Sequence, residues 1–85
     1  MDLAVSESLE MEAGVQPLDA LMGEASMRNH DLVAASAEGL THKQVAKARR
    51  GRKLTLRLQR KVLAAWNAAR AEERRLAELF NYTGR

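Results

Sequence analysis

The sequence contains no cysteine, a single proline and one residue each of tryptophan, tyrosine and phenylalanine. The absence of cysteine excludes disulfide bonds and cysteine-ligated zinc, and it suits a protein of a reducing compartment. The 2 histidines cannot complete a metal site alone, so we expect no metal and no other cofactor. The longest apolar runs, residues 32–35 and 62–66, are far shorter than the ~20 residues of a membrane span, so we expect no membrane partner.

Catalytic signatures are also missing. The chain has no Ser, His and acid set at a recognisable spacing, no glycine-rich phosphate loop and no carboxylate pair in a basic cleft. We therefore predict that the protein is not an enzyme and has no small-molecule substrate. The first residues are acidic and lack the apolar run of a secretory signal. We expect a cytoplasmic protein that is associated with the nucleoid of a bacterium or phage.

Acidic residues are absent from residues 42–61, a stretch of twenty that holds nine Lys or Arg. The net charge of +3 divides into −6 for residues 1–26 and +9 for residues 27–85. Solvated surfaces usually mix both signs, so this basic segment indicates a surface that faces a polyanion, most commonly a nucleic acid. Apolar residues such as Val45 and Leu58 recur within it, which indicates that the segment folds.

The length of 85 residues fits one small domain. Few β-branched residues and no strand pattern favour an all-α fold. We predict a compact bundle of four to five short helices, with a central helix-turn-helix and a longer C-terminal helix. A flexible acidic arm is expected at 1–15, the helix-turn-helix domain at 16–70 and a helical extension at 71–85. A short amphipathic helix in the arm is the alternative.

Local signals predict the first two helices. Pro17 fits the first position of a helix near 17–25, because the N–H that proline lacks has no partner there. Asn29 is a favourable N-cap, so a second helix is expected near 30–37. These two short helices precede the segment with the strongest signals.

The third expected helix begins at a capping box. Thr41 and Gln44 have the spacing at which each side chain satisfies the backbone N–H of the other. Leu40 and Val45 flank the cap as a hydrophobic staple. Gly51 is expected to end the helix, because glycine readily adopts the positive φ of a C-terminal cap.

A fourth helix is expected from the pair Leu54-Thr55. No glycine or proline interrupts residues 52–83. The helix therefore either continues past Arg70 or bends near 70–75, with a separate element after the bend. Its inner face is predicted to consist of Leu58, Val62, Ala65, Trp66 and Ala69.

Residues 31–51, DLVAASAEGLTHKQVAKARRG, resemble the helix-turn-helix of the λ repressor and Cro family. In that motif a small residue is followed after four positions by a glycine and after six more by an apolar residue, and Ala35, Gly39 and Val45 match these positions. The phrases NHDLVAAS, LTHKQVAKARRGR and LFNY also resemble small bacterial proteins predicted to be regulators. The resemblance covers about residues 17–70 and extends to the LFNY end at residues 79–82.

The turn of the motif departs from the family pattern. Glu38 stands where the family usually has an apolar residue, and the apolar pair Leu32-Val33 lies one position early. One extra residue in the turn would restore the register. The resemblance therefore implies the identity of the recognition helix more firmly than the angle between the two motif helices.

The resemblance implies a sequence-specific transcriptional regulator that binds double-stranded DNA through its second motif helix. Gln44 would pair with adenine unless the capping box occupies it, and Lys43 or Lys47 would reach guanine O6 and N7. The positions that match the base-reading residues of the family are Thr41, His42, Lys43, Gln44 and Lys47.

Other positive and polar residues flank these positions. Helix N-termini and the basic residues after the recognition helix are expected to hold DNA phosphates. The expected phosphate contacts are Asn29, His30, Arg49, Arg50, Arg52 and Lys53.

Regulators of this family commonly bind as homodimers, so the resemblance implies a homodimer on a two-fold site. An exposed apolar cluster at the C-terminal end would be a liability unless a partner covered it. The expected dimer contacts are Leu76, Leu79, Phe80 and Tyr82.

Two other functions are compatible with the basic segment. The protein would bind nucleic acid without sequence preference, as a nucleoid or RNA-associated protein. Alternatively, residues 54–70 would form a basic amphipathic helix that docks on a membrane or an acidic partner protein, with Trp66 as its anchor. If the protein binds DNA, with or without sequence preference, the acidic residues of the arm at 1–15 would compete with the DNA for the basic surface.

Overall fold

The computed structural model describes residues 13–85, which form five α-helices and no β-strand. This confirms the predicted all-α bundle. Of the expected acidic arm, residues 1–12 lie outside the described residues, and so does its alternative helix. The helices are α2 (Pro17–Glu24), α3 (Asn29–Ala35), α4 (His42–Arg50), α5 (Leu56–Arg70) and α6 (Leu76–Leu79).

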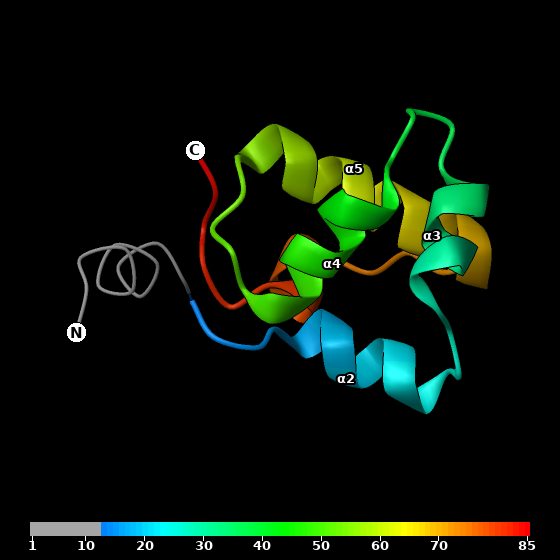
Figure 1. Ribbon diagram of the computed structural model, residues 1–85, viewed down its shortest axis with the longest axis horizontal. Helices are drawn as coiled ribbons and strands as arrows, with labels where there is room; N and C mark the ends of the chain where they lie inside the picture. Colours follow the sequence, from blue (N-terminus) through cyan, green and yellow to red (C-terminus); the bar gives the residue numbers. More distant parts are fainter. Residues whose placement is uncertain (1–12) are drawn as a thin grey trace.

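One hydrophobic core joins all five helices. In Figure 1, α2 and α5 lie on opposite sides of α4, and α4 contacts both of them. Trp66, the largest core side chain, is only 2% exposed. The buried apolar residues are Leu18, Met22, Leu32, Leu40, Val45, Ala48, Leu54, Val62, Ala65, Trp66, Leu79 and Phe80.

Helix α3 starts and ends earlier than predicted. Its N-cap is Arg28 rather than Asn29, and the carboxylate of Asp31 accepts the Arg28 backbone N–H at 2.7 Å. The helix ends at Ala35 because the Ser36 hydroxyl accepts the backbone N–H groups of Glu38 and Leu40, at 3.1 and 3.2 Å. A serine side chain thus replaces the next helical hydrogen bonds and turns the chain toward α4.

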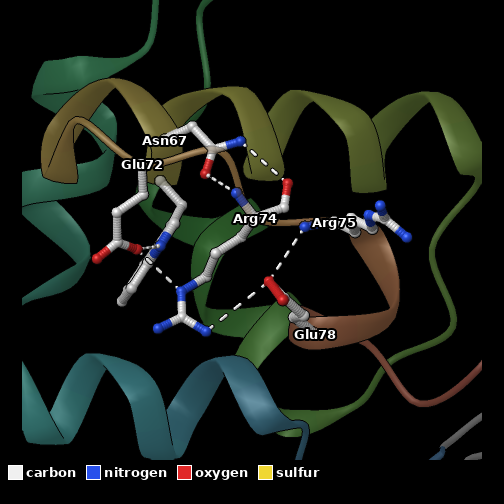
Figure 2. Close-up of polar contacts among 6 residues, drawn as sticks. Asn67, Glu72, Arg74, Arg75 and Glu78 are labelled. Carbon is white, nitrogen blue, oxygen red and sulfur yellow. Dashed lines mark hydrogen bonds and ion pairs between the residues drawn. The ribbon is translucent and has the colours of Figure 1, made fainter.

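Helix α5 ends at Arg70, so the second of the two expected arrangements is correct: a bend follows, and α6 is a separate helix. Ala71 adopts a left-handed conformation with φ of 54°. The side chain of Asn67 makes two hydrogen bonds to the backbone of Arg74 (Figure 2). These bonds stabilise the bend without the glycine or proline that usually marks a bend in a sequence.

The predicted inner face of α5 is correct except at its last residue. Val62, Ala65 and Trp66 are buried and Leu58 is partly buried, but Ala69 is exposed. Ala69 lines an open surface groove between α5 and α3, together with Ala34 and Ala35.

An ion-pair cluster fixes the bend. The Trp66 indole N–H donates to Glu72 at 2.8 Å, and the Arg74 guanidinium donates to the same oxygen at 2.9 Å (Figure 2). These hydrogen bonds, from Trp66 first and then from Arg74, hold the pKa of Glu72 below its ordinary value. Arg74 also lies 3.8 Å from a carboxylate oxygen of Glu78, and so connects the bend to α6.

The C-terminal apolar residues belong to the core. Leu79 is 0% exposed and Phe80 is 3% exposed, and α6 contacts both α2 and α5. Leu76 and Tyr82 are partly buried against the same core. The prediction that these four residues form an exposed dimer contact is therefore wrong for Leu79 and Phe80, which are already covered by their own chain.

Two buried glutamines, Gln16 and Gln59, bind the C-terminal segment, residues 76–85, to the rest of the bundle. The amide of Gln16 donates to Asn81 Oδ1 at 2.9 Å and accepts the Asn81 backbone N–H at 2.8 Å. The amide of Gln59 donates to the Tyr82 carbonyl and accepts the Gly84 N–H. The C-terminal helical extension expected at 71–85 is therefore packed into the bundle through these contacts.

Candidate nucleic-acid interface

The start of α4 has the predicted cap. The Gln44 backbone N–H donates to Thr41 Oγ1, and the Thr41 backbone N–H donates to Gln44 Oε1, both at 3.1 Å. Leu40 and Val45, the two residues of the expected staple, are buried. Gly51 ends the helix in a left-handed conformation with φ of 95°. Local sequence alone therefore defines both ends of this helix.

Helix α4 divides cleanly into a buried and an accessible side. Val45 and Ala48 are 0% exposed, whereas His42 and Lys43 are exposed and Lys47 is partly exposed. None of the ion pairs found within residues 13–85 uses Lys43 or Lys47. The accessible side thus carries cationic groups that the described part of the chain does not neutralise.

The cap limits what Gln44 can read. Bidentate recognition of adenine needs both the oxygen and the nitrogen of the amide. Gln44 Oε1 already accepts the Thr41 N–H, and the Thr41 hydroxyl accepts the Gln44 N–H. We therefore assign Gln44 to the cap and keep His42, Lys43 and Lys47 as the side chains available for base contacts.

Two histidine side chains, one from α3 and one from α4, lie against each other. The rings of His30, in α3, and His42, the first residue of α4, are stacked with centroids 5.8 Å apart and an interplanar angle of 26°. Both residues are exposed. His30 is an expected phosphate contact and His42 an expected base contact, and the structure brings these two side chains together.

Arg49 and Asn29 have partners within the bundle. Arg49 Nε donates to Asp19 at 2.6 Å, and Arg49 Nη1 donates to Asn29 Oδ1 at 2.8 Å. One guanidinium thus connects α4 to both α2 and α3. Because Arg49 already pairs with Asp19, it is a weaker phosphate candidate than the exposed basic residues. Asn29 stays a candidate, because its bond to Arg49 uses the amide oxygen and not the N–H groups that would donate to a phosphate.

The segment between α4 and α5, residues 51–55, is called the basic loop here because it contains Arg52 and Lys53. Lys53 is exposed and Arg52 is partly exposed, and the exposed Arg50 precedes them at the end of α4. These three residues stay phosphate candidates.

Backbone hydrogen bonds hold the basic loop at both ends. The Ala13 N–H donates to the Gly51 carbonyl at 2.7 Å, and the Leu56 N–H donates to the Arg85 carbonyl at 2.7 Å. In Figure 1 the C-terminal segment, in red, runs beside the loop that leads into α5. The loop is thus enclosed by segments from the two ends of the described chain.

The side chains that hold the C-terminal segment beside this loop were missed in the sequence. Gln59 was not assigned to the inner face of α5, yet it is only 1% exposed and binds Tyr82 and Gly84. A glutamine on the buried side of an amphipathic helix is the one signal that the sequence offered.

Comparison of the chain with protein-family models, with curated proteins and with solved structures gave no match. The relation to the λ repressor and Cro family therefore stays a prediction from the motif. Within residues 13–85 no helix has both the length and the apolar composition needed to cross a bilayer. Trp66, the expected anchor of the alternative membrane-docking helix, is buried in the core and does not reach the surface.

Proposed function

We propose that the chain is a sequence-specific DNA-binding transcriptional regulator that places α4 in the major groove. The observation that carries this proposal is the division of α4. Val45 and Ala48 are completely buried, and Lys43 is exposed on a short helix whose ends are both capped. The major groove is about 12 Å wide and admits one such helix.

The accessible side chains suggest a division of contacts. His42, Lys43 and Lys47 belong to α4 and would face base edges, where lysine pairs with guanine O6 and N7. Arg50, Arg52 and Lys53 follow at the end of the helix and in the basic loop, and would hold the phosphate backbone. His30 would approach a phosphate beside His42. Phosphate contacts of this kind supply affinity and register, whereas base contacts supply sequence preference.

A homodimer on a two-fold operator is part of the proposal, with half-sites about one helical turn, ~34 Å, apart. Because Leu79 and Phe80 are buried, the contact between protomers must use other residues. A mass measurement in solution, with and without a duplex of about 20 base pairs, tests this part. Two chains on each duplex are expected, and a single chain on each duplex would rule out the dimer.

The regulator proposal is tested by selecting bound sequences from a pool of random duplexes. Wild-type protein is expected to enrich one short sequence. Lys43→Ala should relax the preference at one base pair, at a cost of ~1–3 kcal/mol against the preferred base. Lys53→Ala should weaken binding to all sequences and lower the salt slope by about one unit. Arg75→Ala removes an exposed charge from outside the basic segment and serves as the control.

Binding without sequence preference is the second candidate function. The observation that favours it is the loss of Gln44 from the base-reading set, which leaves fewer side chains to read bases than to hold phosphates. It predicts that Lys43→Ala and Lys53→Ala weaken every duplex equally. Tight binding of the duplex pool with no enriched sequence would favour this second function and remove the first.

A further inference from the structure

Tyr82 connects the C-terminal segment to the middle of the basic loop. Its hydroxyl donates to the Arg52 carbonyl at 3.0 Å and accepts the Leu54 backbone N–H at 2.8 Å. A single side-chain oxygen thus satisfies two backbone groups on either side of Lys53. Tyr82 is 28 residues from Leu54 and 30 from Arg52, so this contact closes a long segment of the chain.

The Tyr82 ring is itself held in place. It packs edge-on against Phe80, with ring centroids 5.9 Å apart and an interplanar angle of 72°. Phe80 is in the core, and the Tyr82 carbonyl accepts a hydrogen bond from the buried Gln59. The position of the hydroxyl is therefore set by the core, and the hydroxyl in turn sets the backbone of the loop.

The two loop hydrogen bonds determine where Lys53 lies. With the Arg52 carbonyl and the Leu54 N–H both bound to the tyrosine oxygen, the peptide groups on each side of Lys53 are fixed, and its side chain is exposed. A loop that is ordered before binding loses less conformational entropy when a partner engages it. Without the hydroxyl, the same cations would stand on a loop with more freedom.

We propose that Tyr82 is a positioning residue of the nucleic-acid interface: its hydroxyl orders the basic loop so that Arg52 and Lys53 meet successive phosphates of the bound duplex. This inference rests on the proposed function, because it concerns the way in which that function obtains its affinity. Tyr82 itself makes no contact with the nucleic acid in this account. Its predicted role as a dimer contact is replaced by this one.

The test is Tyr82→Phe, which removes the hydroxyl and keeps the ring. Affinity for the preferred duplex is measured from low to high salt. The dissociation constant at low salt is expected to rise about tenfold, and the salt slope to fall by about one unit, the contribution of one phosphate contact. The preferred sequence should not change. Thr83→Ala alters an exposed side chain of the same segment and should bind like the wild type.

A double-mutant cycle with Lys53→Ala separates positioning from a general loss of structure. If Tyr82 acts through the loop, Tyr82→Phe should weaken binding by less than about threefold once Lys53 is replaced. The exchange of the Leu54 amide hydrogen with solvent should be faster in Tyr82→Phe, because its acceptor is gone. Circular dichroism establishes that the variant is folded at the temperature of measurement.

Three results would overturn the proposal. The first is that Tyr82→Phe binds the duplex as tightly as Thr83→Ala does. The second is that the losses of binding free energy caused by Tyr82→Phe and Lys53→Ala add independently. The third is that the Leu54 amide exchanges with solvent at the wild-type rate. A wild-type protein that binds no duplex would instead remove the proposed function, and with it the role of Tyr82 in binding. The exchange rate of Leu54 would still decide whether the hydroxyl orders the loop.

Discussion

Helix α4 and the C-terminal segment, residues 76–85, use their side chains in opposite ways. On α4, Lys43 is exposed and has no ion-pair partner within residues 13–85. The C-terminal segment instead buries Leu79 and Phe80 and binds the bundle through its backbone and side chains. The comparison indicates that the C-terminal segment stabilises the bundle, whereas α4 presents the side chains that carry the proposed function.

The largest effect is expected at Phe80. Phe80→Ala should lower the free energy of unfolding by ~3–5 kcal/mol, because it leaves a cavity between α6 and the core. Chemical denaturation measures the loss. A dimer contact at Phe80 would instead leave the protomer stable and change only the mass in solution, and that outcome would contradict the comparison. Thr83→Ala, in the same segment, should change neither quantity.

Gln59 is expected to have the second-largest effect. Gln59→Ala removes the partners of the Tyr82 carbonyl and the Gly84 N–H, and should destabilise the fold by ~1–3 kcal/mol. The loss should appear in denaturant unfolding. Gln44→Ala is the matched control on α4, because that glutamine is a partly exposed cap residue and its replacement should cost less. Equal losses at the two positions would remove the distinction between the two regions.

The third prediction concerns the N-cap of α4 and tests whether neighbouring residues stabilise this helix. Thr41→Ala should destabilise the protein by ~1 kcal/mol, because the Gln44 backbone N–H loses its acceptor. Thr41→Ser keeps the acceptor and should restore most of the stability. If serine does no better than alanine, the cap does not stabilise α4.

The smallest effect concerns Glu72, whose pKa is lowered by hydrogen bonds from Trp66 and Arg74. A lowered pKa means that the ionised carboxylate stabilises the fold at pH above its ordinary value of about 4.5. That contribution is lost as the pH falls through the lower pKa of the folded state. Glu72→Gln should therefore flatten the acid part of the stability profile, with Trp66 fluorescence as the readout. Glu73→Gln, at the exposed neighbour, should leave the profile unchanged, and a flattening there would contradict this assignment.

The same two regions show how far the sequence could predict the fold. The limits of α4 follow from neighbouring residues, since a Thr41 cap and a Gly51 terminus act over a few positions. The bend after Arg70 and the contacts of Gln16 and Gln59 depend on partners distant in the chain or on a side chain that binds backbone. Such contacts leave no periodic pattern in the sequence.

Only part of the candidate site could be predicted from the sequence, because some of its contacts also join residues that are distant in the chain. Exposure of His42 and Lys43 follows from the helical period once Val45 and Ala48 are assigned to the core. The pairing of Arg49 with Asp19 brings together two helices that are far apart in the sequence, and a basic residue at a helix end gives no sign of it. The role proposed for Tyr82 depends on its contacts with the backbone of Arg52 and Leu54, which only the folded structure reveals.

Base recognition by α4 is tested most directly by a footprint of the wild-type protein and Lys43→Ala on a duplex selected from a random pool. Base recognition by α4 predicts a protected segment confined to the selected sequence, and protection of that segment should weaken by ~1–3 kcal/mol when Lys43 is replaced. Uniform protection of any duplex by the wild-type protein, or protection by Lys43→Ala indistinguishable from it, would contradict the assignment of α4 to base recognition.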